Sequence, residues 1–534
     1  MNRMRKYGFI IAFVVLLIAP LAAHALRGVW HPIFVSGSTE RIVIITPHAQ
    51  DIRNEFRWAF ADWHQKTYGY PVDLEYLTPG GTNDIRRELD LKYRALREAN
   101  HGQLPPENQI NIGIDLVWGG GDYYFNSQLK PLGILHPLNL DPHLLAEVFP
   151  QPALAGVKLY DQSKDPSGKL LPPQWVGVCL SSFGIIFNPD LYRSLNLPPP
   201  KTWSDLADPK LFASLSLADP THSGTATVTY MTIIERAMAD AETDFFNLPQ
   251  NHNRPPAQLK ASPEYQIALD AGWKNGMRQL LLIAANARYF TDSAAQPPND
   301  VASGDAAAGM AIDFYGRVTE ESVGPDRETF VAPRAATAIT PDPIAILYGT
   351  HGKQLELAQH FVEFLLSPEG QQLWILKPGQ PNGPRNRSLR RSPIRQSVYA
   401  NRTGWADDLN YFTSASGFNQ RADWLATQSE LPPIWASAWI DQGDNLRNAY
   451  TTILAISDES RRAKLLADLS DLPITRADVT KEIATRKQIE SDHTEDLDLW
   501  KARQRLAWSQ RFADHYQRIA TEAAAGEASV AGGQ

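Results

Sequence analysis

Cysteine is almost absent from this chain, whose 534 residues include one cysteine, Cys179. An intramolecular disulfide is therefore excluded, and stability must come from core burial, which a chain of this length can supply. The sequence also lacks the Cys and His spacings that are typical of metal clusters. Since Cys179 lies in the apolar stretch of residues 175–180, we interpret it as a buried small hydrophobic residue.

An excess of positive charge is also lacking, because the formal net charge is -8 at pH 7. This balance argues against nucleic acid as a general partner, since phosphate backbones need a basic face. An anionic small molecule stays compatible if positive potential is local, from helix N-termini or a few arginines. The composition, 43% hydrophobic and 21% charged, excludes wholesale disorder.

The chain has no long apolar run beyond its first residues, and we find no repeats. Arg3, Arg5 and Lys6 precede an uncharged apolar run over residues 7–19, and the small residues 23–25 read Ala-His-Ala. This run is short of the roughly 20 residues that span a bilayer, and the pattern is typical of a secretory signal. We predict a signal peptide over residues 1–25, or a signal anchor if it is not cleaved, and a periplasmic location.

The next segment alternates between strand and helix patterns. Strands are predicted at 40–46, 71–77 and 112–118, and amphipathic helices at 51–66 and 84–100. This order predicts a doubly wound α/β lobe with a parallel sheet. Ligands bind at the carboxyl ends of such strands. There the sequence places Pro47-His48, Pro79-Gly80-Gly81-Thr82 and Gly119-Gly120-Gly121-Asp122, although strand ends need turn residues in any case.

A second block repeats the pattern with different content. Strands are predicted at 175–180 and 183–188 around Ser181-Ser182, and at 214–220 before the hydroxyl-rich turn 221–227. Such a turn at a helix N-terminus presents backbone N–H groups and hydroxyls, either as an anion cradle or as an ordinary N-cap. Further strands are predicted at 307–315 and 343–348, then a helix at 356–366. From about residue 400 aromatic side chains are scattered, and 458–469 and 477–525 are expected to be helical.

These blocks, in this order, resemble the extracellular solute-binding proteins of ABC importers, of the iron(III), phosphonate and sugar-phosphate type. The resemblance rests on LTPGGTNDIRREL (77–89), DLVWGGGDYYF (115–125), WVGVCLSSFGIIFNPD (175–190), KTWSDLADPKLFASLSLADPTHSGTA (201–226), SGDAAAGMAIDFYG (303–316) and AQHFVEFLLSPEGQQLW (358–374). It covers about residues 40–395.

The resemblance implies an α/β periplasmic-binding-protein fold with two lobes, an interlobe cleft that closes by hinge motion, and a C-terminal helical extension. The expected domains are a first lobe at 26–175, completed by about 310–395, a second lobe at 176–309, and an extension at 396–534. The implied function is capture of a small anionic ligand (phosphonate, sugar phosphate or carboxylate) and delivery to an ABC permease. No cofactor, no nucleic acid and a monomeric state are expected.

Carried over by position, the resemblance also implies the residues that line the cleft. They are Pro47, His48, Gly80, Gly81, Thr82, Asn83, Trp118, Gly119, Gly120, Asp122, Ser181, Ser182, Thr221, Ser223, Gly224, Thr225, Asp313 and Tyr315.

Three alternatives stay open. Iron-binding members present adjacent tyrosines where this chain has Phe314-Tyr315, so a ferric ion is disfavoured; its ligands would be Tyr315, Tyr123 and His48. The same cleft would also serve a binding protein that reports ligand to a membrane receptor. An enzyme is disfavoured, because no G-x-S-x-G elbow supports a hydrolase built from Ser181 or Ser182 with His222 and Asp219.

The C-terminal extension, 396–534, has two interpretations. One is a helical cap packed on a lobe, which we favour. The other is a docking arm for the permease or another partner, for example through the Trp-rich residues 405–439.

Overall fold

The computed structural model of the chain describes residues 40–413, 420, 430–492 and 496–531, with side chains described up to residue 525. The predicted signal, 1–25, lies outside the described residues, as does part of the aromatic segment 405–439. Among the helices that the structure describes, none is long and apolar enough to span a membrane.

The strands form one large sheet and a small hairpin. In chain order they are β1 (Glu40–Ile45), β2 (Val72–Leu77), β3 (Leu116–Trp118), β4 (Leu135–His136), β5 (Ala153–Leu154), β6 (Val157–Lys158), β7 (Val176–Phe187), β8 (Leu215–Ala218), β9 (Ala287–Thr291), β10 (Ala308–Ile312), β11 (Thr329–Val331), β12 (Ile339–Leu347) and β13 (Ser392–Pro393).

The main helices are α2 (Gln50–Tyr68), α3 (Thr82–Ala99), α4 (Pro142–Val148), α5 (Pro189–Ser194), α6 (Gly224–Phe246), α7 (Pro256–Lys260), α8 (Pro263–Ala285), α9 (Gln296–Ser303), α10 (Asp313–Val323), α11 (Gly352–Leu366), α12 (Pro368–Leu373), α13 (Leu431–Trp435), α14 (Gly443–Leu454), α15 (Glu459–Ser470), α16 (Arg476–Asp492) and α17 (Leu497–Ala531). Short 3-10 and π-helical turns join them, including η2 (Tyr124–Leu129).

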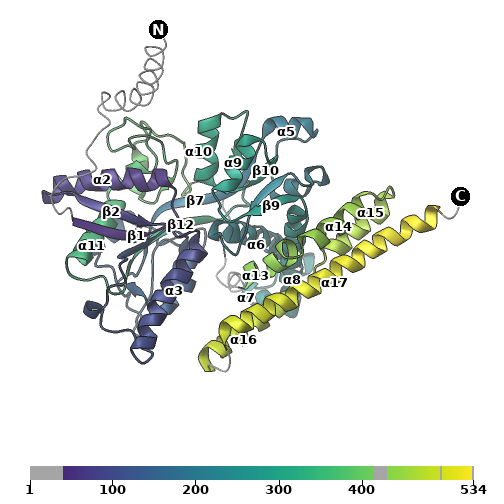
Figure 1. Ribbon diagram of the computed structural model, residues 1–534, viewed down its shortest axis with the longest axis horizontal. Helices are drawn as coiled ribbons and strands as arrows, with labels where there is room; N and C mark the ends of the chain where they lie inside the picture. Colours follow the sequence, from purple (N-terminus) through teal and green to yellow (C-terminus); the bar gives the residue numbers. More distant parts are fainter. Residues whose placement is uncertain (1–39, 414–419, 421–429, 493–495, 532–534) are drawn as a thin grey trace, which may run out of the picture.

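The sheet order shows two α/β lobes. The strands run β2-β1-β3-β12-β7-β10-β8-β9. On one side β1 pairs in parallel with β2 and β3, and on the other β8 pairs in parallel with β9 and β10. Figure 1 shows α2, α3 and α11 beside the first set and α9 and α10 beside the second. The predicted α/β class with two doubly wound lobes is confirmed.

The strand β7 joins the lobes. Its first half, to Ser182, pairs antiparallel with β12, and its second half, from Phe183, pairs antiparallel with β10. The sequence predicted two strands around Ser181-Ser182, but the structure has one continuous strand. The strand can continue through these two polar residues because both hydroxyls have hydrogen-bond partners in the core. Arg391 donates to Ser181, and Ser182 bonds with the Tyr411 hydroxyl.

The predicted strand at 307–315 was too long at its C-terminal end. β10 ends at Ile312, and Asp313 begins α10. The chain turns there because the Asp313 carboxylate accepts a hydrogen bond from the backbone N–H of Phe314, and its second oxygen accepts from that of Ser182. This local capping outweighs the apolar run that suggested a longer strand.

In the second lobe, α6 and α8 pack at very short range through two glycines of α8. A Cβ atom at Gly276 would lie 2.5 Å from the Cα of Ile234, and one at Gly272 would lie 2.7 Å from the Cα of Met238. Any larger residue would separate the helices. Residues of the extension pack against this pair of helices.

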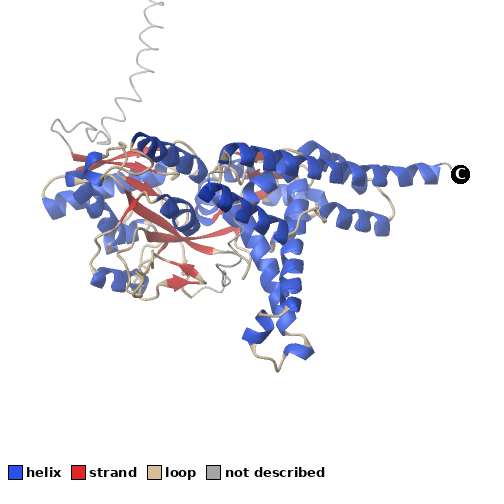
Figure 2. Cartoon of the chain, turned by 90° about the horizontal axis from the view of Figure 1, so that it is seen from below, coloured by secondary structure: helices blue, strands red, loops and turns tan. Residues whose placement is uncertain are grey.

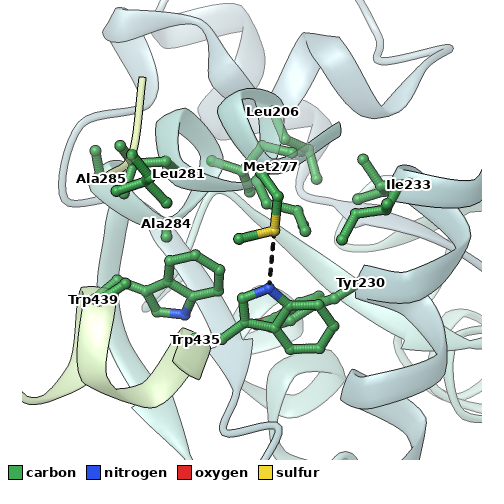
Figure 3. Close-up of a cluster of buried hydrophobic side chains, with 14 of the residues drawn as sticks. Leu206, Tyr230, Ile233, Met277, Leu281, Ala284, Ala285, Trp435 and Trp439 are labelled. Atoms are coloured by element: carbon green, nitrogen blue, oxygen red, sulfur yellow. Dashed lines mark hydrogen bonds between the residues drawn. The ribbon is translucent and has the colours of Figure 1, made fainter. Parts of the chain in front are cut away.

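From Leu431 on, the C-terminal extension shares the hydrophobic core of the second lobe, whereas Val398, Trp405, Leu409 and Tyr411 belong to the core of the first lobe. Figure 2 shows strands in the lobes and only helices towards the C-terminus. Trp435 and Trp439 lie against α6 and α8, where the Trp435 indole N–H points at the Met277 sulfur, 3.3 Å away (Figure 3). Phe512 and Tyr516 of α17 belong to the same buried cluster. Its packing is that of a cap on the second lobe.

Candidate functional site

A cavity of about 520 Å³ lies between the two lobes. The first lobe lines it with the loops that follow β1, β2 and β3, and the second lobe with those that follow β8, β9 and β10. These are the carboxyl ends of all six parallel-paired strands, the position where open α/β sheets bind ligands. We call this cavity the cleft.

The structure brings most of the predicted residues to the cleft. Those that line it are Pro47, His48, Gly80, Gly81, Thr82, Gly120, Ser181, Ser223, Gly224, Thr225 and Tyr315. α3 begins at Thr82 and α6 at Gly224, so the first turns of two helices, one from each lobe, face the cleft. Such turns carry backbone N–H groups without intrahelical acceptors and a partial positive charge.

Two predicted residues instead hold the lobes together at the edge of the cleft. The Asn83 side-chain amide donates to the backbone carbonyl of Thr221, at 3.0 Å. Nearby, a Cβ atom at Gly81 would overlap the carbonyl oxygen of His222. The loops of the two lobes are therefore in direct backbone contact here.

Five other predicted residues are not part of the cleft lining. Trp118 is fully buried and meets the His48 ring edge-on, with ring centroids 4.4 Å apart. Gly119 has φ of +97°, where a side chain would crowd His48. Burial raises the pKa of Asp122 to about 7. Ser182 and Asp313 are buried together with Tyr411, whose hydroxyl donates to the Asp313 carboxylate.

The carboxylates of Asp84, Asp292 and Asp342 line the cleft together with an arginine that the sequence reasoning missed, Arg391. This residue is 1% exposed and lines the cleft. Its Nη1 donates to the Asp342 carboxylate at 2.5 Å and its Nη2 to the Ser181 hydroxyl at 2.7 Å, while its Nε is buried without a partner in the described structure. Phe314 and Trp374 lie against the guanidinium, 4.4 and 5.1 Å from it.

His48 and Asp342 complete a buried polar cluster with Arg391. The His48 Nε2 lies 2.7 Å from the Asp342 carboxylate, and the backbone N–H of Gly120 donates to its other oxygen at 3.0 Å. Burial would raise the pKa of Asp342, but Arg391 and His48 hold it well below its usual range. Burial, with Arg391 and Arg53 nearby, lowers the pKa of His48. At neutral pH the cluster holds one cation, one anion and a neutral imidazole.

The structure does not assemble the iron ligands considered from the sequence. Tyr315 and His48 line the cleft, but Tyr123 lines a different cavity. Burial raises the pKa of Tyr315 to about 12, which disfavours a phenolate. Over the described ranges, no three His, Cys, Asp or Glu side chains are grouped to hold a metal ion.

The residues of the hydrolase alternative have other partners. The Ser181 hydroxyl accepts from Arg391, and the Asp219 carboxylate accepts from the Thr221 backbone and hydroxyl. His222 lies 3.8 Å from Asp84. Within the described part of the chain, no hydrogen bond joins Ser181 or Ser182 to His222, so no nucleophile and base are paired.

A family model described as bacterial extracellular solute-binding protein matches residues 124–382. The predicted resemblance to extracellular solute-binding proteins is confirmed. The match covers the second lobe and the later segments of the first, but neither residues 40–123, which hold β1, β2 and β3, nor the extension.

Two curated proteins are similar to this chain over part of their length. The phosphoglycerate transport regulatory protein PgtC of Salmonella typhimurium is 25% identical over 240 residues, which are 44% of this chain and 50% of that protein. An uncharacterized protein of Haemophilus influenzae is 25% identical over 260 residues, 48% of this chain and 60% of that protein. The chain thus spans about half the length of the curated relatives it matches.

Solved structures of periplasmic binding proteins are also similar. P5PA is 18% identical with a TM-score of 0.48, covering 70% of this chain and 91% of its own. AfuA of Actinobacillus pleuropneumoniae, solved with fructose-6-phosphate, is 20% identical with a TM-score of 0.47, and the match covers 73% of this chain and 97% of AfuA.

Proposed function

We propose that the chain is an exported solute-binding protein that captures a small phosphorylated organic anion in the cleft and delivers it to an ABC permease. One observation carries the ligand class: a buried arginine and the first turns of two helices converge on one cavity. Guanidinium groups and helix N-termini both favour phosphate oxygens. The name of PgtC, a phosphoglycerate transport regulatory protein, supports the same class.

The rest of the cleft suits a small organic body on that anion. Phe183, Phe314 and Ile312 line it beside the hydroxyls of Thr82 and Thr225. An apolar wall with a few placed polar groups is the usual composition of a small-molecule site. A phosphate ester or phosphonate with a short carbon chain fits this pattern without a metal ion.

The ligand class is tested by calorimetry and thermal shift on residues 26–534. We expect saturable binding of 3-phosphoglycerate, glycerol 3-phosphate or fructose 6-phosphate, and none of glycerate, glycerol or fructose at the same concentrations. Binding to the native state alone raises the melting temperature by mass action. Equal responses to the phosphorylated and unphosphorylated members of each pair, or a response to ferric citrate alone, would overturn the proposal.

The role of Arg391 is tested by Arg391→Lys, which keeps the charge and loses the planar fork. We expect affinity for the phosphorylated ligand to fall about tenfold or more. Arg390→Lys is the matched control, because Arg390 binds Glu321 and Asp407 outside the cleft. An unchanged affinity in Arg391→Lys would remove this residue from the site.

A sensory function is a second candidate, since PgtC is named a regulatory protein. The two functions separate in cells that lack this chain and express the permease from a constitutive promoter. Delivery requires the chain itself, so uptake of the labelled ligand stays lost. If the chain only reports the ligand to a receptor that induces the permease, uptake returns.

A further inference from the structure

A second cavity, of about 490 Å³, lies beside the cleft at the junction of three parts of the molecule. The first lobe lines it from α3 and η2, the second lobe from the start of α6, and the extension from α16 and α17. The two cavities meet at a thin wall, where a Cβ atom at Gly224 would lie 3.0 Å from the Thr82 hydroxyl. We call it the junction cavity.

Five cationic side chains line the junction cavity, and Arg87, Arg486 and Arg505 among them are paired with carboxylates. The other two come from different parts of the molecule. Arg86 comes from α3 of the first lobe and Lys501 from α17 of the extension. In the described part of the chain Arg86 has no ion pair, and the carboxylate paired with Lys501 is Asp498 on its own helix, at 4.0 Å. Burial, and then the nearby positive charge of Arg86, lower the pKa of Lys501.

Three carboxylates also line the junction cavity, and each has a partner among the other residues of its lining. Glu430 and Glu490 both accept from Arg486, at 2.6 Å each. Glu482 accepts from the Trp508 indole at 2.8 Å. Within the described structure neither Arg86 nor Lys501 forms an ion pair with these three carboxylates, although Glu430 acts on Lys501 at longer range. An added anion would relieve the repulsion between the two cations.

A buried phenol also lines the same cavity. Tyr124 lines the cavity and is 2% exposed, yet its hydroxyl makes no hydrogen bond within the described structure. Burial raises the pKa of this phenol, so it is a neutral donor. Because Arg86 lies close enough to act on this phenol, the hydroxyl is a candidate donor to an anion bound beside Arg86.

We propose that the junction cavity is a second binding site, separate from the cleft, for a small phosphate or phosphate-ester oxyanion held between Arg86 and Lys501. Tyr124 donates the third contact. Because Lys501 belongs to the extension, which shares a core with the second lobe, the anion bridges the two lobes. It therefore stabilises the arrangement in which the lobes touch, since a ligand favours the state that holds its contacts together.

The test is equilibrium dialysis of the full chain with labelled inorganic phosphate, at constant ionic strength set with chloride. The double variant Arg86→Gln/Lys501→Gln should lose one bound equivalent, or bind it at least about tenfold more weakly. Arg503→Gln is the matched control, because Arg503 lies on α17 but not at the cavity. It should keep that equivalent.

Arg391→Lys separates this site from the cleft. If inorganic phosphate also enters the cleft, Arg391→Lys loses the other equivalent and keeps this one. If inorganic phosphate does not enter the cleft, Arg391→Lys binds the same number of phosphate equivalents as the wild type. The proposal is overturned if the wild type shows no saturable phosphate binding, or if the double variant, folded with a wild-type melting temperature, binds the same number of equivalents with the same affinity.

Discussion

Arg391, Asp342 and His48 form one buried cluster on the cleft although they lie far apart in the sequence. Removing the arginine charge would leave Asp342 as an uncompensated buried anion. Such a loss typically lowers the free energy of unfolding by about 3–5 kcal/mol, which is a large share of the stability of a domain. For this reason a lysine, rather than an alanine, is the informative substitution at position 391.

Glu235 of α6 gives a pH dependence that can be measured. Burial raises its pKa to about 8; one carboxylate oxygen accepts from Gln420 at 2.8 Å, and the other has no partner in the described structure. The folded protein thus holds a proton that the unfolded chain releases above its ordinary pKa of 4.5. This contribution to stability is complete below that pKa and is lost as pH rises towards 8.

Glu235→Gln should therefore raise the free energy of unfolding at pH 8 by at least about 1 kcal/mol and flatten its decline between about pH 5 and pH 8. Denaturant melts across this pH range measure both. Asp240→Asn, on the exposed side of the same helix, should leave the slope unchanged. A slope for Glu235→Gln equal to that of the wild type would show that the carboxyl ionises freely in the fold.

Local patterns predicted the cleft residues that sit at strand ends, such as His48, Gly81 and Thr225, because strand ends and turn residues are visible in a short window. Local patterns could not predict Arg391 as a cleft residue. It follows no strand of the parallel sheet, and its partners Ser181 and Asp342 are brought to it only by the folded sheet. Burial of a charge depends on long-range packing, which no local pattern encodes.

At the scale of elements, the helices of the extension were predictable and their packing was not. Charge and alanine content indicated helices at 458–469 and 477–525, near the observed α15, α16 and α17. The sequence left open whether they form a cap or an arm. The shared core with α6 and α8 favours the cap, because it buries Trp435 and Trp439 against the second lobe.

Trp435→Ala should lower the free energy of unfolding by about 3–5 kcal/mol, since it empties a fully buried indole site between the extension and the second lobe. Chemical denaturation monitored by circular dichroism measures this. Leu506→Ala, on α17 with 71% exposure, should change stability by less than about 0.5 kcal/mol. A soluble, folded chain after deletion of 400–534 would contradict the cap and favour an arm.

At the scale of the whole molecule, the cleft is bounded by backbone contact between the lobes. Gly81 has φ of -74°, so an alanine fits its backbone, but the added methyl would collide with the His222 carbonyl of the other lobe. Gly81→Ala should therefore hinder this contact while leaving each lobe intact.

We expect Gly81→Ala to weaken binding of the phosphorylated ligand about tenfold, mainly through faster dissociation, with an unchanged melting temperature in the ligand-free protein. Stopped-flow dissociation and calorimetry measure this. Gly443→Ala is the control, because a Cβ atom there meets nothing within 4 Å. Wild-type dissociation from Gly81→Ala would mean that contact at this edge does not retain the ligand.

The long helix α17 also has a mechanical consequence. It spans 35 residues, hence about 52 Å at 1.5 Å per residue, and its end lies beyond the lobes in Figures 1 and 2. Because α17 packs on the second lobe, a rotation between the lobes would move its far end most. A rotation of about a tenth of a radian would displace the tip by roughly 5 Å. A spectroscopic label near the tip would magnify the opening and closing of the cleft into a displacement large enough to follow in real time.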